Sequence, residues 1–182
     1  MPRTRTELER DAKVDEIVEA AVGRLREGGY DALSVAGVAR ELGLAQNAVY
    51  WYFPSKDHLF VAAVERMLRD VIARKPPRRR DLERRVLWFV EQLDAMRDVR
   101  AAMYERARTS EVVATFAGRL QALWRRMLAN VLSSRVPEED LETTVEALLA
   151  TIQGVLLEER TPAERARVVS YALRRLVPGA TD

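Results

Sequence analysis

The chain has 182 residues, of which 48% are hydrophobic and 32% charged, with a net charge of +2; this composition favours one or two small globular domains and leaves nucleic-acid binding open. It contains no cysteine and one histidine, His58, which excludes disulfides and zinc fingers and disfavours histidine-based catalysis. No apolar run approaches the roughly 20 residues that span a bilayer, and the N-terminus lacks the apolar stretch of a signal peptide, so we expect a cytoplasmic protein.

Helical periodicity begins near the N-terminus. Apolar residues three or four apart predict a helix of about five turns, with Gly28 and Gly29 as its stop. Ser34 is a good N-cap for a short helix that Gly43 ends, and a second short helix is expected from about Gln46 to Tyr52. Two short helices joined by a tight glycine turn are typical of a helix-turn-helix.

The rest of the chain is also predicted to be helical. A fourth helix is expected from Lys56 to about Arg74, where the sequence KPPRRR interrupts it because tandem prolines cannot continue a helix. Amphipathic patterns then predict helices over 81–96, 99–108 and 112–132, followed by two that open at Pro137 and Pro162. With no strand pattern anywhere, the predicted fold class is all-α.

Tyr50, Trp51, Tyr52 and Phe53 are four consecutive aromatic residues. A helix buries one stripe of its surface, so these four rings cannot all face the core, and some must point toward solvent or a partner. The second helix of a helix-turn-helix presents its start to the major groove of DNA, where amide side chains read adenine. Gln46 and Asn47 stand at that start, and the Tyr50 hydroxyl follows one turn later, suited to a phosphate.

The stretch from Ile17 to Phe60 resembles the N-terminal DNA-binding domain of the TetR family of bacterial transcriptional regulators. The residues that carry the resemblance are Gly29, Tyr30, Ser34, Val38, Ala39, Gly43, Tyr50, Tyr52, Phe53 and Lys56. The resemblance implies a three-helix DNA-binding domain over 1–55, a connecting helix over 56–75 and a helical effector-binding and dimerisation domain over 76–182. The sequence departs from the family pattern at Ala36, Gly37 and Ala45. Gly37 replaces an acidic residue that usually completes a capping box.

The resemblance also implies which residues meet DNA. The expected contacts are Ser34, Gln46, Asn47, Tyr50, Trp51, Tyr52 and Lys56, while Phe53 packs into the core. For Trp51 and Tyr52 the alternative is packing against the fourth helix, and for Lys56 it is a solvated surface position. Arg3, Arg5 and Arg10 suggest a flexible basic arm beside the duplex, or simply solvated charges.

Two further sets of residues are candidates in the C-terminal part. Aromatic and methionine side chains are expected to line an effector pocket, or alternatively to form plain core: Trp88, Phe89, Met96, Met103, Tyr104, Phe116, Trp124 and Met127. The last two helices resemble the family's dimerisation pair, with an apolar seam that would otherwise pack within one chain: Val145, Leu149, Ile152, Leu156, Val169 and Leu173.

The sequence therefore predicts a homodimeric transcriptional repressor that binds a palindromic DNA operator and responds to a small-molecule effector. The alternative is a helical interaction protein or an architectural DNA-binding protein without an effector. No cofactor and no metal are expected. An enzyme is disfavoured because the chain offers no phosphate loop, no thiol and no histidine pair.

Overall fold

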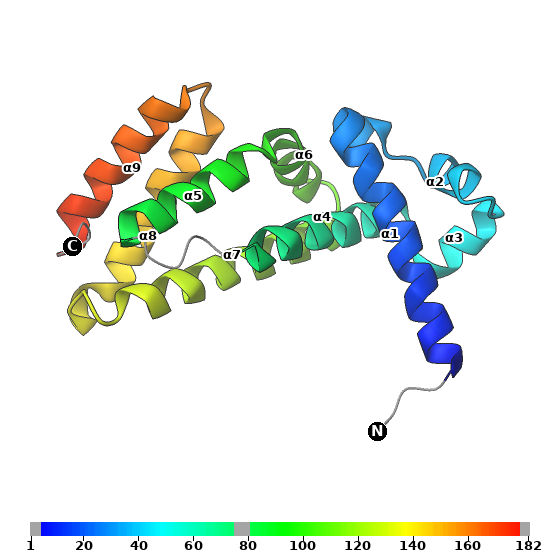
Figure 1. Ribbon diagram of the computed structural model, residues 1–182, viewed down its shortest axis with the longest axis horizontal. Helices are drawn as coiled ribbons and strands as arrows, with labels where there is room; N and C mark the ends of the chain where they lie inside the picture. Colours follow the sequence, from blue (N-terminus) through cyan, green and yellow to red (C-terminus); the bar gives the residue numbers. More distant parts are fainter. Residues whose placement is uncertain (1–4, 75–80, 179–182) are drawn as a thin grey trace. The chain divides into compact units, whose positions relative to one another are not determined.

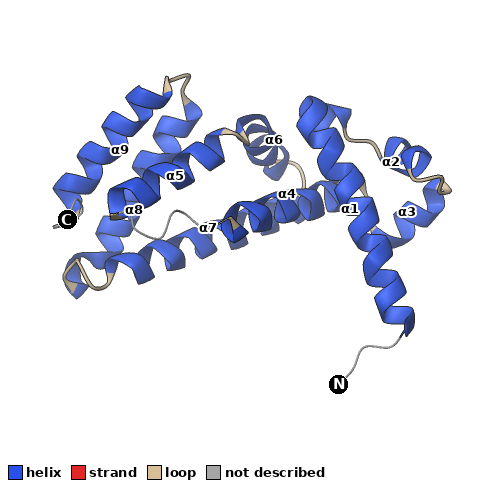
Figure 2. Ribbon diagram, viewed as in Figure 1, coloured by secondary structure: helices blue, strands red, loops and turns tan. Residues whose placement is uncertain are grey.

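A computed structural model describes residues 5–74 and 81–178 of the chain. Throughout these residues the secondary structure is helical, which confirms the predicted all-α class (Figure 2). The helices are α1 (Arg5–Ala32), α2 (Val35–Glu41), α3 (Gln46–Tyr52), α4 (Lys56–Ala73), α5 (Leu82–Asp94), α6 (Arg97–Ala107), α7 (Glu111–Leu132), α8 (Glu138–Leu157) and α9 (Pro162–Leu176). In the described ranges, none of these helices has the length and apolar character to cross a membrane.

Helix α1 begins earlier in the chain than its apolar pattern predicts. Its helical geometry is interrupted at Gly28 and Gly29, where the sequence predicts the end of the helix. Gly29 has a φ of 64°, in the left-handed region that favours glycine, and it separates the main helix from a last short turn. Arg5 and Arg10 lie within α1, so they do not belong to a flexible arm. Arg3 and the KPPRRR sequence at 75–80 lie outside the described residues.

Helices α2 and α3 form the predicted helix-turn-helix. The Ser34 side chain accepts a hydrogen bond from the Gly37 backbone N–H at 2.9 Å, which caps the start of α2. Gly43 supplies the tight turn with a φ of 65°. Ala45 stands at the N-cap of α3 without a side-chain hydrogen bond, as its replacement of the usual hydroxyl residue implies.

The structure gives a reason for Gly37. An added Cβ there would lie 2.6 Å from Ser34 Oγ and 2.8 Å from a guanidinium nitrogen of Arg24. Arg24 reaches across from α1, donates to the Gly37 carbonyl at 3.1 Å and pairs with Glu41 at 2.9 Å. The space that a capping-box side chain would fill therefore belongs to an arginine that joins α1 to both ends of α2.

The chain divides into two compact units. Unit 1 comprises residues 1–73 and 98–117, and unit 2 comprises residues 74–97 and 118–182. This division differs from the expected domain boundaries, because α4 and most of α6 belong with the helix-turn-helix. In unit 1, α4 packs across α1 (Figure 1), with Leu59 and Phe60 fully buried at its start and Val64 and Val71 buried further along.

Unit 2 has its own apolar core, to which α5, α8 and α9 contribute. Four of the six residues expected at a dimer seam lie in this core, with 0–4% exposure: Val145, Leu156, Val169 and Leu173. The apolar stripes of α8 and α9 face each other and α5 within one chain, so these four side chains have no surface left for a partner. Leu149 and Ile152 are half-buried at the edge of the core.

Candidate nucleic-acid interface

Helix α3 divides its side chains into an inner and an outer set. Val49 is fully buried and Phe53, just after the helix, is 8% exposed, so these two residues attach α3 to the core of unit 1. Gln46 and Asn47 are exposed in the first turn. Two large rings also face outward, since Tyr50 is 40% and Trp51 is 67% exposed. An exposed amide pair at the start of a helix has the donor and acceptor groups that can read the edge of adenine.

The outer rings of α3 are ordered by one another and by an arginine. Trp51 and Tyr52 meet edge to face, with ring centroids 4.7 Å apart. The guanidinium of Arg10, from the first part of α1, lies 5.2 Å from the Trp51 ring centroid, within cation–π range. Tyr52 is half-buried. Arg10, which lies within α1, therefore brings a positive charge next to the exposed rings of α3.

Lys56, the first residue of α4, is half-buried and partly enclosed by unit 1. Its ammonium lies 3.9 Å from the centroid of the Tyr30 ring, and burial lowers the pKa of this lysine. The Tyr30 ring also meets the Phe60 ring edge to face, with centroids 5.0 Å apart. The family landmarks Tyr30 and Lys56, 26 positions apart in the sequence, are thus in direct contact.

Asp57, next to Lys56, is held by a cluster that the sequence did not reveal. Arg106 of α6 donates to both carboxylate oxygens, at 3.3 and 2.9 Å, and the Tyr30 hydroxyl donates at 2.7 Å. Burial favours a raised pKa for Asp57, but hydrogen bonds from Arg106, Tyr30 and Ser110 outweigh it and lower the pKa to about 2. Burial and the same hydrogen bond raise the pKa of Tyr30 to about 12.

The pKa of Asp57 predicts a defined loss of stability in acid. The folded carboxyl titrates near pH 2, below its ordinary value of 3.8, so its stabilising contribution is complete above about pH 5 and is lost as the pH falls toward 2. We expect the free energy of unfolding of the wild type to fall more steeply over this range than that of Asp57→Asn. Urea denaturation at a series of pH values measures both slopes, and parallel curves would contradict the assignment.

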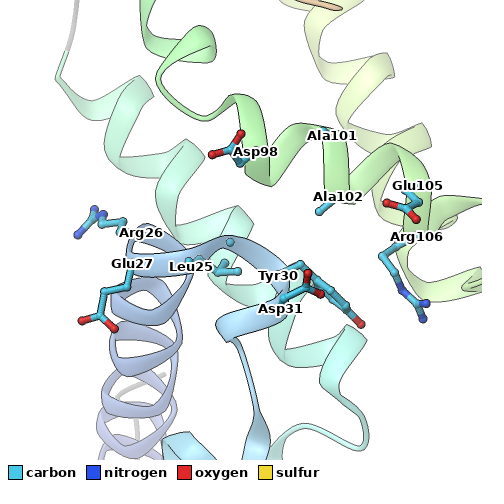
Figure 3. Close-up of a pocket in the computed structure, with 12 residues that line it drawn as sticks. Leu25, Arg26, Glu27, Tyr30, Asp31, Asp98, Ala101, Ala102, Glu105 and Arg106 are labelled. Atoms are coloured by element: carbon cyan, nitrogen blue, oxygen red, sulfur yellow. The ribbon is translucent and has the colours of Figure 1, made fainter.

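A pocket of about 720 Å³ lies in unit 1 between residues 25–31 at the end of α1 and residues 98–106 of α6 (Figure 3). Its lining is mainly polar and includes Tyr30 and Arg106. None of the eight residues expected to line an effector pocket contributes to it. Three of those eight, Met96, Met103 and Phe116, are buried at 6% or less, in agreement with the plain-core alternative, and the other five are half-buried.

The structure thus brings most of the predicted DNA contacts to one helix and the start of the next. Gln46, Asn47, Tyr50, Trp51 and Tyr52 lie on α3, and Lys56 begins α4. Ser34 is exposed but its hydroxyl caps α2. Sequence reasoning missed Arg106, because it lies 49 positions from Asp57 and in a segment that the helical pattern assigned to the other domain.

Residues 17–63 match the sequence model of the bacterial regulatory proteins of the tetR family. The HTH-type transcriptional repressor KstR of Rhodococcus jostii (strain RHA1) is 32% identical over 134 residues, which cover 68% of this chain and 61% of that repressor. The class A tetracycline repressor protein from transposon 1721 of Escherichia coli is 37% identical over 65 residues, 36% of this chain and 30% of that protein. The chain thus spans less than two-thirds of either repressor.

Solved structures resemble the chain over nearly its whole length. A transcriptional regulator from Rhodococcus sp. Rha1 superposes with a TM-score of 0.72 at 24% identity, covering 90% of this chain and 95% of that one. A candidate transcriptional regulator from Saccharomonospora viridis, crystallised in complex with choline, gives a TM-score of 0.70 at 17% identity and covers 92% of this chain and 98% of that one. At these identities the likeness establishes the fold.

Proposed function

By its residues 17–63 this chain belongs to the TetR family of bacterial regulatory proteins, and we propose that it is a cytoplasmic, sequence-specific transcriptional repressor without enzymatic activity. It binds a palindromic DNA operator as a homodimer. Two relatives that are 32% and 37% identical to parts of this chain are named as repressors. The observation that carries the proposal is the division of α3, which buries Val49 and presents Gln46, Asn47, Tyr50 and Trp51 outward.

These side chains have separate tasks in the proposed complex. Gln46 and Asn47 enter the major groove and read base edges, since an amide matches the donor and acceptor of adenine. Tyr50 and Lys56 bind phosphates and fix the position of the helix without reading sequence. Trp51 and Tyr52 face the backbone beside them. Ser34 contributes by fixing the start of α2, and any contact it makes with DNA comes second to this cap.

The dimer that the operator requires forms through α8 and α9. The residues buried in the chain's own core are unavailable to it, but Leu157 on α8 and Tyr171 on α9 are 72% and 59% exposed, and both are large apolar side chains. Half-buried Leu149 and Ile152 extend this surface. Two reading heads related by a two-fold axis then bind half-sites a whole number of helical turns apart.

A small-molecule effector is proposed to release the DNA by binding the non-DNA conformation better. The half-buried members of the expected pocket set, Trp88, Phe89, Tyr104, Trp124 and Met127, are candidates for its contacts. One structural neighbour was crystallised with choline, which supports a ligand-responsive helical domain in proteins of this fold but does not give this chain the same ligand.

Selection of randomised duplex DNA by the purified protein, at about physiological salt, tests this function. The wild type is expected to enrich a palindrome, and Tyr50→Ala is expected to lose it while still folded and dimeric. Tyr50→Phe keeps the ring and removes only the hydroxyl, so it separates the phosphate hydrogen bond from ring contacts. Enrichment of no sequence, with steeply salt-dependent binding to any DNA, would favour an architectural role instead.

A further inference from the structure

Asp57 presents a difficulty for the proposed DNA contact of Lys56. Its carboxylate lies in the first turn of α4 and directly follows Lys56 in the chain. The Lys56 ammonium is the group that is proposed to bind a phosphate. Charges closer together than the Debye length of about 8 Å are poorly screened, so an uncompensated carboxylate beside Lys56 would repel a phosphate bound there. It also offers the ammonium a competing partner, in addition to the Asp31 carboxylate that already acts on this lysine.

Arg106 removes both effects. Its Nε and Nη2 donate to the two oxygens of Asp57 at 3.3 and 2.9 Å, and the Tyr30 hydroxyl adds a third hydrogen bond at 2.7 Å. A two-pronged guanidinium contact compensates a carboxylate more completely than a single donor does. The Asp57 side chain is only 14% exposed. Its charge is therefore paired and its acceptor positions are largely occupied.

The Lys56 ammonium packs on Tyr30, whose hydroxyl is bound to Asp57. It lies on the face of the Tyr30 ring, 3.9 Å from the centroid. The Arg106 guanidinium also lies near this ring, 5.4 Å from its centroid, so Tyr30 contacts both cations and the carboxylate. A cation–π contact of this kind is weak and neutralises no charge, so the lysine can still turn to a phosphate.

We propose that Arg106 is a positioning residue for DNA binding, which compensates Asp57 and thereby keeps the Lys56 ammonium available to a phosphate. The inference rests on the proposed function and assigns a role to a residue of α6, outside the helix-turn-helix. Arg106 acts through its neighbours and need not touch DNA itself.

The alternative is that the Arg106–Asp57 ion pair only holds α6 against α4. The two roles predict different changes in DNA affinity when Asp57 is replaced. If Arg106 compensates a harmful charge, Arg106→Gln weakens DNA binding, Asp57→Asn does not, and the double variant returns to about the wild-type affinity. If the pair only ties the helices together, each single variant weakens binding and the double variant does not recover. The two hypotheses thus disagree on both Asp57→Asn and the double variant.

The experiment measures the affinity of the full-length protein for its selected operator by fluorescence anisotropy over a range of salt concentrations. We expect Arg106→Gln to weaken binding about fivefold or more, because an unpaired charge within a Debye length of a phosphate costs on this order. Its plot of log affinity against log salt should flatten by about 0.9 for each phosphate that Lys56 no longer neutralises. In a Lys56→Gln background the salt slope should no longer respond to Arg106→Gln.

Arg108→Gln is the matched control. It removes the same charge two positions further along, at an exposed residue after α6, and it should change affinity much less than Arg106→Gln. Circular dichroism and sedimentation confirm that each variant is folded and has the wild-type oligomeric state. Equal effects of the two arginine variants, or a weakened Asp57→Asn, would overturn the role proposed for Arg106.

A readout without DNA separates failure of this inference from failure of the proposed function. The Tyr30 ring should shift the NMR signals of the Lys56 side-chain protons upfield in the wild type. Arg106→Gln should abolish that shift as the ammonium moves to Asp57, and the double variant should restore it; an unchanged shift overturns the inference. A wild-type protein that selects no operator defeats the proposed function, and this is evident before any variant is compared.

Discussion

Replacing Gln46 and Asn47 together by alanine is expected to abolish preference for the operator while leaving salt-dependent binding to DNA intact. Each bidentate contact between an amide side chain and adenine gives about 1–3 kcal/mol of discrimination, and a dimer makes each of the two contacts twice, so the preference should fall by roughly 1,000-fold or more. Phosphate contacts from Tyr50 and Lys56 are unaffected, which preserves the non-specific component.

Both substitutions should leave the fold unchanged, because the two side chains are exposed in the first turn of α3 and alanine is a better helix former than either. Gln121 and Asn130 provide a matched control, since they are an exposed amide pair on the part of α7 that belongs to unit 2. Competition binding with operator and scrambled duplexes measures the preference. A double variant that still discriminates would show that sequence is read elsewhere.

The second large effect concerns stability in unit 2. Arg165 is 5% exposed and its guanidinium donates to Asp94 and to the Arg160 carbonyl, while Arg97 pairs with Asp94 from the exposed side at 2.9 Å. Without Arg165 the Asp94 carboxylate keeps Arg97 as a partner but loses its buried donor, and the Arg160 carbonyl loses a charged donor as well, so we expect Arg165→Met to lower the free energy of unfolding by about 2–3 kcal/mol.

Replacement of both partners should cost less than replacement of either one. In Arg165→Met with Asp94→Leu no buried charge is left unpaired, and exchange of an ion pair for apolar groups is often close to neutral. Arg167→Met is the control, since Arg167 is exposed on the same helix. Urea denaturation at a fixed protein concentration measures the wild type, the two single variants, the double variant and the control. If the double variant is as unstable as the sum of the singles, the pair does not act as a unit.

Local patterns in the sequence were sufficient for the helices and their ends. Ser34, Gly43 and Pro162 stand where the structure starts or stops an element, because caps, left-handed turns and proline act over three or four residues. The same spacing separates Val49 and Phe53, which are buried, from Tyr50 and Trp51, which are not. The family resemblance then gave these exposed rings their expected DNA contacts.

Only the tertiary structure decided which neighbour covers each apolar stripe. Periodicity identifies the inner side of α8 and α9 but not what it packs against, so the expected dimer seam includes Val145 and Leu173, which α5, α8 and α9 enclose within one chain. Likewise, an acidic residue after Lys56 has no partner in the local sequence. The contact between Asp57 and Arg106 joins residues 49 positions apart, and such a pair is fixed by packing of whole helices rather than by any short-range pattern.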